Sequence, residues 1–153
     1  MDLNKHKNNI KQLISVDKEL KTTLNTICSY LKTNIKHYDW VGFYFKNGTK
    51  NELKLMSFAG KPTEHTIIPF GKGICGQVAI NNETFLVADV TAQDNYISCG
   101  IEVKSEIVVP VFKNDENIGQ IDIDSHTINA FSKKDEEFLG FVCQQISEIL
   151  TKK

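Results

Sequence analysis

Two neighbouring segments near the end of the chain constrain the fold more than any other feature. SEIVVPVF, residues 105–112, and IGQIDIDS, residues 118–125, have strand character and are separated by the polar residues KNDEN. Side chains in a strand alternate between two faces, so the odd positions of both segments supply one apolar face. A hairpin buries both apolar faces together when odd residues pair with odd ones. The expected pairings therefore include Val108 with Asp122 and Glu106 with Asp124.

The order of the other segments indicates an α+β fold. A 3.6-residue apolar rhythm predicts one helix from Ile10 to about Lys36, and a second helix is expected from Ser132 to Leu150. A short helix is expected in GICGQVAINN, residues 73–82. The other expected strands are YDWVGFYF, ELKLMSF, HTIIPF and TFLVADV. Strands in a run with helices at both ends are typical of an antiparallel sheet covered on one face by the terminal helices.

Length and charge balance limit the classes of function. The chain of 153 residues suits a single domain, residues 1–153. Its 18 basic and 19 acidic residues leave no excess positive charge for binding nucleic acid or an anionic membrane surface. The sequence contains no signal peptide and no apolar run of the roughly 18 residues that span a bilayer. We therefore expect a cytoplasmic protein with no nucleic-acid or membrane partner. The oligomeric state stays open, and a homodimer is compatible with the sequence.

The stretch GKGICG, residues 71–76, matches the G-x-G-x-x-G pattern of dinucleotide-binding domains. In such domains the pattern opens the first of several β-α-β units. Here it follows a predicted meander and precedes a hairpin, without further crossover helices. The element order therefore argues against dinucleotide binding, and no bound cofactor is expected. The glycines are better explained as the turn before a short helix.

Strand alternation also collects an unusual group of side chains on one face of the predicted sheet. The core face is expected to hold Val41, Phe43, Phe45, Ile107, Val109, Val111, Ile121 and Ile123. The opposite face combines two aromatic residues with three acids and no base: Trp40, Tyr44, Glu106, Asp122 and Asp124. Acids paired across a ladder repel each other, so either one carboxyl keeps its proton or a cation lies between them. The plain alternative is three solvated acids that splay apart.

The residue types narrow the nature of such a cation. A calcium site needs more oxygen ligands than these acids supply, and the sequence has no calcium-binding loop. A zinc site would need His65 and Cys99 to converge on the acids, and the spacing gives no support for this. No metal is therefore expected. The ammonium group of an amino acid, flanked by Trp40 and Tyr44, uses every residue of this face.

The four cysteines form no C-x-x-C pair, which disfavours a zinc ribbon or a dithiol motif. Cys28 and Cys143 lie on apolar helix faces and are expected to be buried. Cys75 lies in the first turn of the short helix, where the helix dipole favours a thiolate. Cys99 lies in TAQDNYISCGIEVK, a long polar segment that is a candidate functional loop. Cys75 and Cys99 are the candidate reactive thiols, the alternative being that both are incidental.

Five motifs, in order and spacing, closely resemble the stand-alone GAF-domain enzymes known as free methionine-(R)-sulfoxide reductases: WVGFY, IPFGKGICG, VADV, SEIVVPVF and IGQIDIDS. The similarity extends from about residue 38 to residue 139. It implies a GAF fold with a ligand pocket on the sheet face away from the terminal helices, free methionine sulfoxide as substrate and thioredoxin as reductant. At the matching positions it implies Cys99 as the attacking cysteine, Cys75 as the cysteine of the glycine motif, and Trp40, Tyr44, Glu106, Asp122 and Asp124 as the substrate pocket.

Two positions depart from the family pattern. His65 stands where the family usually has a further cysteine, ten residues before Cys75, which is the usual recycling partner of the attacking cysteine. The family sequence HIACD is YISCG here, so the histidine and the aspartate that flank the attacking cysteine are absent. Cys75 is then the one matched thiol left to resolve Cys99.

These residues lead to one reaction hypothesis and two alternatives. The Cys99 thiolate attacks the sulfoxide sulfur, a protonated carboxyl among Glu106, Asp122 and Asp124 gives a proton to the oxygen, and Cys75 closes a disulfide on the resulting sulfenic acid. Thioredoxin then reduces that disulfide. One alternative is a sensory GAF module that binds an amino-acid-like ligand and reports redox state through its cysteines. The other is a purely structural interaction protein, which leaves the acidic face unexplained.

Overall fold

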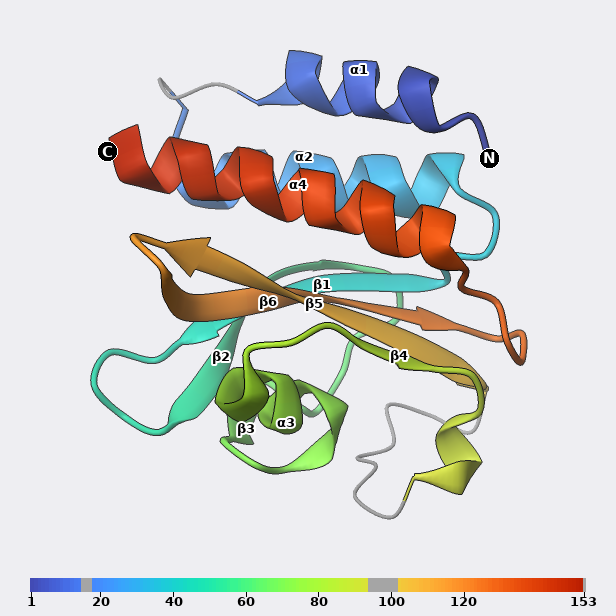
Figure 1. Ribbon diagram of the computed structural model, residues 1–153, viewed down its shortest axis with the longest axis vertical. Helices are drawn as coiled ribbons and strands as arrows, with labels where there is room; N and C mark the ends of the chain where they lie inside the picture. Colours follow the sequence, from blue (N-terminus) through green and yellow to red (C-terminus); the bar gives the residue numbers. More distant parts are fainter. Residues whose placement is uncertain (15–17, 94–101, 153) are drawn as a thin grey trace.

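A six-stranded antiparallel sheet forms the centre of the molecule (Figure 1). The computed structural model describes residues 1–14, 18–93 and 102–152. The strands are β1 (Trp40–Lys46), β2 (Glu52–Ala59), β3 (Ile67–Pro69), β4 (Phe85–Val87), β5 (Ser105–Lys113) and β6 (Glu116–Ser125), and the helices are α1 (Leu3–Leu13), α2 (Leu20–Asn34), α3 (Gly73–Asn81), α4 (Lys133–Lys152) and the 3₁₀ turn η1 (Val90–Ala92). The strand order is β3-β2-β1-β6-β5-β4, and all neighbouring strands are antiparallel.

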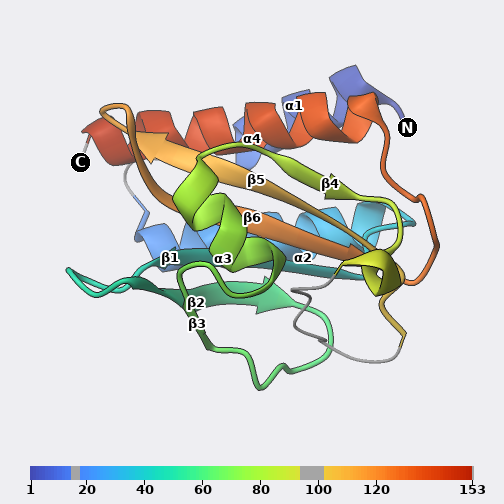
Figure 2. The same ribbon diagram turned by 60° about the horizontal axis from the view of Figure 1, so that its bottom comes forward.

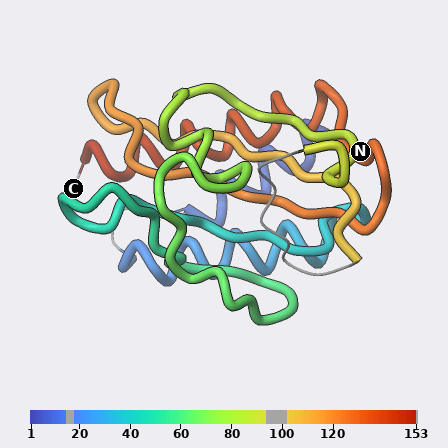
Figure 3. Tube along the Cα trace, turned by 90° about the horizontal axis from the view of Figure 1, so that it is seen from below, coloured from blue at the N-terminus to red at the C-terminus, as the bar shows by residue number. Residues whose placement is uncertain are grey.

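Helices cover the two faces of the sheet unequally. α2 and α4 lie side by side on one face, and α1 lies on their outer side (Figure 1). α3 lies on the opposite face, across the middle of the sheet (Figure 2), and the view from below shows it in front of the strands (Figure 3). The expected α+β fold, with the terminal helices on one face, is therefore confirmed.

The register of the β5–β6 hairpin is the one that the apolar alternation predicts. Glu106 pairs with Asp124, and Val108 pairs with Asp122. All eight side chains expected on the core face are buried in one cluster with α2 and α4. Burying an aliphatic or aromatic side chain of this size contributes roughly 1.5–3 kcal/mol, so this cluster fixes which face of each strand points to the helices.

The single helix predicted from Ile10 to about Lys36 is wrong. α1 already begins at Leu3, because the Asp2 side chain accepts a hydrogen bond from Lys5 N at 3.1 Å and caps the helix. It ends at Leu13, and Ile14 is extended. The apolar rhythm offers a reason, since it stops at Ile14 and resumes at Leu20. The two helices therefore pack their apolar stripes separately.

The other helices begin and end close to the predicted positions. α3 ends at Asn82, whose φ of 62° is the left-handed conformation that asparagine tolerates. α4 follows Ser132, whose Oγ accepts from Lys134 N at 3.3 Å. None of the helices in the described part of the chain is long and apolar enough to cross a membrane.

Candidate active site

The five side chains predicted on the second face of the sheet all lie there and are buried. Asp124 of β6 pairs with Trp40 of β1 on one side and with Glu106 of β5 on the other. Asp122 lies two residues earlier on β6 and therefore shares that face. The exposed fractions are 6% for Trp40, 0% for Tyr44, 4% for Glu106, 2% for Asp122 and 1% for Asp124. This burial excludes three solvated acids that splay apart.

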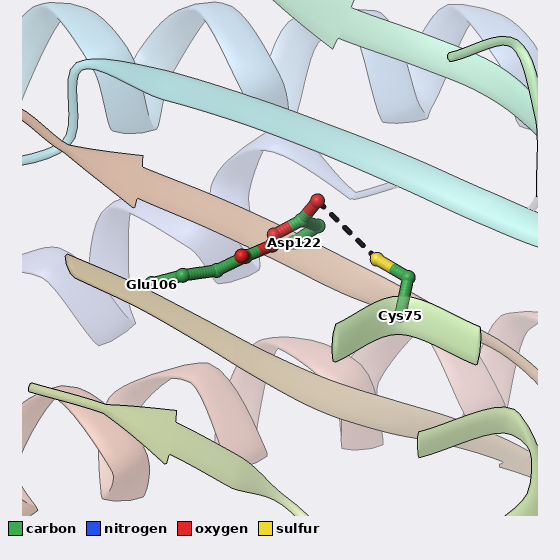
Figure 4. Close-up of side chains that lie close together, drawn as sticks. All are labelled: Cys75, Glu106 and Asp122. Atoms are coloured by element: carbon green, nitrogen blue, oxygen red, sulfur yellow. Dashed lines mark hydrogen bonds between the residues drawn. The ribbon is translucent and has the colours of Figure 1, made fainter. Parts of the chain in front are cut away.

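Cys75 lies directly against two of these acids. Its Sγ donates a hydrogen bond to Asp122 Oδ2 at 3.3 Å. One side-chain atom each of Cys75, Glu106 and Asp122 lies within 4.8 Å of the others. Figure 4 shows the three side chains converging from α3, β5 and β6. A thiol and two carboxyls thus form one buried cluster, although their positions in the sequence are far apart.

The carboxyl of Asp122 holds its proton more tightly than a solvated acid does. Burial raises the pKa of Asp122, and its hydrogen bonds with Glu106 and Cys75 offset this only in part. Two acids that share a site cannot both ionise at little cost. The surroundings therefore favour a retained proton on the Asp122–Glu106 pair. This is one of the two possibilities that the sequence left open for the acidic face.

The prediction that the helix start makes Cys75 a thiolate is wrong. Cys75 is only 3% exposed. Burial raises the pKa of its thiol well above the ordinary value, and the carboxyls of Asp122 and Glu106 raise it further. Burial and two neighbouring acids therefore outweigh the helix dipole, which contributes typically 0.3–1 kcal/mol near a helix end. These surroundings favour the thiol form of Cys75, which donates a hydrogen bond to Asp122.

The glycines of GKGICG shape the turn that places this thiol. Gly73 has a φ of 62°, a conformation that side chains with a Cβ rarely adopt. A Cβ on Gly76 would lie 2.7 Å from Pro69 O, so the helix could not approach β3 as closely. The antiparallel sheet excludes the dinucleotide-binding arrangement, as the element order indicated.

The acidic face holds a narrow cleft and a wider pocket. The cleft lies between Tyr44, Cys75, Glu106 and Asp122 and has a volume of about 10 Å³, room for about one water molecule. The pocket has a volume of about 500 Å³, and Trp40 and Asp124 line it. Tyr44, Glu106 and Asp122 therefore line the cleft together with Cys75. The other two predicted site residues, Trp40 and Asp124, line the wider pocket.

Each of the two aromatic residues is anchored by its polar end. Tyr44 OH donates to His65 O at 2.7 Å, and Trp40 Nε1 donates to Lys61 O at 2.9 Å. Both bonds fasten the segment between β2 and β3 over the sheet. His65, where the family usually has a cysteine, therefore lines the cleft and accepts a hydrogen bond through its backbone.

The remaining cysteines fall into two groups. Cys28 and Cys143 are buried, as predicted, and burial raises the pKa of each thiol to about 12. Cys99, the predicted attacking residue, lies outside the described residues. The chain after it is held in place, because Lys104 N donates to Ser125 O at 2.8 Å and Val90 N donates to Lys104 O at 2.9 Å.

Sequence reasoning overlooked Gln120. Its side chain is fully buried on β6, and its Nε2 donates to Cys75 O at 2.7 Å. A signal was available, because position 120 has the same parity as Asp122 and Asp124 and therefore belongs to the same face. Gln120 therefore lies on the same face of β6 as Asp122 and Asp124, beneath α3.

Cys75, Glu106 and Asp122 are also the described residues that come near enough to share a metal ion. The hydrogen bond from the thiol to Asp122 accounts for part of this proximity without an ion. Thiol and carboxyl protons can occupy the space between the three groups. The geometry alone therefore gives no reason to invoke a metal.

A protein-family model described as GAF domain matches residues 17–151. Free methionine-R-sulfoxide reductase of Escherichia coli is 31% identical over 149 residues, which cover 97% of this chain and 87% of that protein. The chain belongs to the free methionine-R-sulfoxide reductase family of GAF domains.

Two further members of this family are similar to the chain. Free methionine-R-sulfoxide reductase of Saccharomyces cerevisiae is 41% identical over 112 residues, which cover 72% of this chain and 62% of that protein. The structure of free methionine-R-sulfoxide reductase from Neisseria meningitidis, solved in complex with its substrate, has a TM-score of 0.86 and 30% identity. The match covers 98% of this chain and 87% of that one.

Proposed function

We propose that this protein reduces free methionine-(R)-sulfoxide to methionine with Cys99 as the attacking thiol and Cys75 as the resolving thiol. The observation that carries the proposal is the buried cluster of Cys75, Asp122 and Glu106 in a chain of this family. The cluster combines a thiol with an acid pair that retains a proton, and the reaction needs both.

In the first half-reaction, the Cys99 sulfur attacks the sulfoxide sulfur. The oxygen is protonated by the Asp122–Glu106 pair and passes from the substrate to Cys99. Methionine and a Cys99 sulfenic acid result, so the substrate sulfur is reduced and the cysteine sulfur is oxidised. A carboxyl whose pKa is raised is suited to this step, because it keeps its proton to a higher pH than a solvated acid does.

In the second half-reaction, the Cys75 sulfur attacks the sulfenic sulfur. The S–S bond forms, the S–O bond breaks, and the thiol proton leaves with the hydroxyl group as water. Thioredoxin, with two thiols of its own, returns both cysteines to the reduced state. Cys75 needs no thiolate at rest for this role, because Asp122 accepts its hydrogen bond and can take the proton during attack.

The wider pocket beside the cluster offers a place for the amino-acid end of the substrate. Asp124 has the charge to pair with an ammonium group, and Trp40 supplies an aromatic wall for it. Because Asp122 and Asp124 are neighbours on one face of β6, a ligand that reaches both would span the pocket and the cleft. The cleft must open to admit the sulfoxide, since its present volume suits about one water molecule.

The test is a coupled assay with thioredoxin, thioredoxin reductase and NADPH, in which NADPH consumption follows reduction of free methionine-(R)-sulfoxide. We expect turnover with the R epimer, none with the S epimer, and none for Cys99→Ser. Cys143→Ala is the matched control, because this thiol is buried on the other side of the sheet and should leave turnover unchanged.

Equal NADPH consumption by the wild type and Cys99→Ser would refute the enzymatic proposal. If calorimetry then showed that methionine sulfoxide still binds, the chain would be a binding or sensory GAF module. Release of one equivalent of methionine without turnover would support the first half-reaction and contradict Cys75 and thioredoxin as the route that regenerates Cys99.

A further inference from the structure

The amide of Gln120 ties the thiol-bearing turn of α3 to the sheet. Its Nε2 donates to Cys75 O at 2.7 Å, while Cys75 Sγ donates to Asp122 Oδ2 at 3.3 Å. Gln120 and Asp122 lie two residues apart on the same face of β6. The backbone and the sulfur of Cys75 are thus both held from one strand.

Packing alone does not explain an amide at position 120. The side chain is fully buried, and within the described residues its Oε1 has no hydrogen-bond partner. A methionine or leucine would fill similar space without burying an unpaired oxygen, which is costly in a protein interior. The amide N–H groups must therefore supply something that an apolar side chain cannot.

The groups around the Cys75 sulfur show what that is. Asp122 faces it from β6 and Glu106 from β5, while Tyr44, His65 and Lys72 line the same cleft. Burial and the two acids raise the pKa of the thiol, whereas the Gln120 side chain lowers it through a hydrogen bond. A neutral amide donor can stabilise a thiolate without bringing a charge into the cleft.

We propose that Gln120 is the positioning residue for Cys75: its amide holds the backbone of Cys75 and thereby keeps the sulfur against Asp122 for its attack. The importance of this for turnover rests on the proposed function, in which Cys75 resolves the sulfenic acid. The positioning itself does not, because the bond from Gln120 Nε2 to Cys75 O joins two parts of this chain.

The test compares two amides of β6 that both hold α3. Asn117 Nδ2 donates to Val78 O at 3.1 Å, at the end of α3 that is remote from Cys75. The reduced wild type, Gln120→Met and Asn117→Ala are labelled with iodoacetamide between pH 7 and 10. Mass spectrometry of the peptide that contains Cys75 gives the labelling rate of this thiol at each pH. We expect Gln120→Met to slow labelling at pH 8.5 by about tenfold, one pKa unit, and to move the profile to higher pH. Asn117→Ala should keep the wild-type pH profile.

A purely structural role would give the opposite result. Loosening α3 exposes Cys75, so labelling would become faster at every pH without a shift of the profile, in Gln120→Met as in Asn117→Ala; that outcome overturns the proposal. If Gln120→Met does not fold, Gln120→Glu keeps the shape and should slow labelling further, since it places a third carboxyl beside the thiol.

A second measurement separates this inference from the proposed function. In a single turnover with methionine-(R)-sulfoxide, Gln120→Met should release methionine at the wild-type rate but close the disulfide about tenfold more slowly. If the wild type releases no methionine, the proposed function fails, while the labelling profiles still decide the role of Gln120. Equal rates of disulfide closure in the wild type and Gln120→Met would contradict that role.

Discussion

One face of the sheet is covered by α2 and α4 (the helix side) and the other by α3 (the α3 side). Asp135 on the helix side and Asp122 on the α3 side are both buried, but their pKa values are shifted in opposite directions. Asp135 in the first turn of α4 is 3% exposed and accepts from Tyr38 OH and His37 Nε2, both at 2.8 Å, and from Ser132 N at 2.9 Å. Burial acts to raise its pKa, but the hydrogen bonds from His37, Ser132 and Tyr38 lower it overall. Asp122, 2% exposed, meets a thiol and another acid instead, and burial raises its pKa.

The difference shows that the partners of a buried acid, more than its burial, decide what it can do. Surrounded by donors, Asp135 stays ionised and fastens the start of α4 to the chain before β1. Asp122 lies beside Glu106, so the pair favours keeping one proton, which in the proposed mechanism goes to the substrate. We therefore expect the helix side to contribute mainly stability, whereas in the proposed mechanism the α3 side serves the chemistry at a cost in stability.

The largest effect is expected from Asp122→Asn. The amide cannot give up a proton as an acid does, so turnover of methionine-(R)-sulfoxide should fall by at least about 100-fold. The NADPH-coupled assay measures this. Glu116→Gln serves as the control, because this acid lies at the exposed start of the same strand and pairs with Lys46, so its turnover should stay at the wild-type level. A loss below tenfold for Asp122→Asn would remove the acid pair from the mechanism.

Ile123→Ala probes the opposite face of the same strand. Ile123 lies between Asp122 and Asp124, is fully buried and belongs to the core with α2 and α4. Its truncation should lower the free energy of unfolding by about 2–5 kcal/mol, measured by urea denaturation. The turnover of the folded fraction should change little. A small loss of stability combined with a large loss of turnover would contradict this division between the two faces.

Asp135→Asn should cost about 1–3 kcal/mol of stability at pH 7, since the carboxylate accepts four hydrogen bonds. Because the folded-state pKa of Asp135 is lowered, its contribution is present above the unfolded value of about 3.9 and is lost as the pH falls through the folded value. Urea titrations from pH 7 down to pH 3 should therefore show the difference from the wild type shrinking. A difference that is constant with pH would mean that the charge of Asp135 plays no part.

Asp122→Asn should have a smaller effect on stability, with the opposite sign. Because the folded-state pKa of Asp122 is raised, ionisation disfavours folding at pH values above the unfolded value of about 3.9. The variant should be more stable than the wild type at pH 7, and the difference should vanish as the pH approaches 4. The same urea titrations detect it. A variant that is less stable at pH 7 would show that the cluster contributes to folding.

The sheet and its two faces could be predicted because strand alternation has a period of two, and a misplaced register would have exposed Ile121 and Ile123. The same argument placed Asp122 and Asp124 on the acidic face. The break between α1 and α2 was missed because it is marked only by the gap in the apolar rhythm between Ile14 and Leu20.

Properties that depend on packing could not be predicted from local sequence. The thiol state of Cys75 was misjudged because burial beneath α3 and two acids from distant strands outweigh the local helix dipole. The His37 and Tyr38 bonds to Asp135 join residues about a hundred positions apart, which no periodicity reveals. The role of Cys99 as the attacking cysteine remains a prediction, since this residue lies outside the described residues.

The most direct test of the central claim is a single turnover without any external reductant. Fully reduced protein is mixed with excess methionine-(R)-sulfoxide, methionine is quantified, and the cysteine pairing is mapped by mass spectrometry of the digested protein. We expect about one equivalent of methionine per chain and a Cys75–Cys99 disulfide. An absence of methionine, or one equivalent of methionine with Cys75 still a free thiol, would contradict the account.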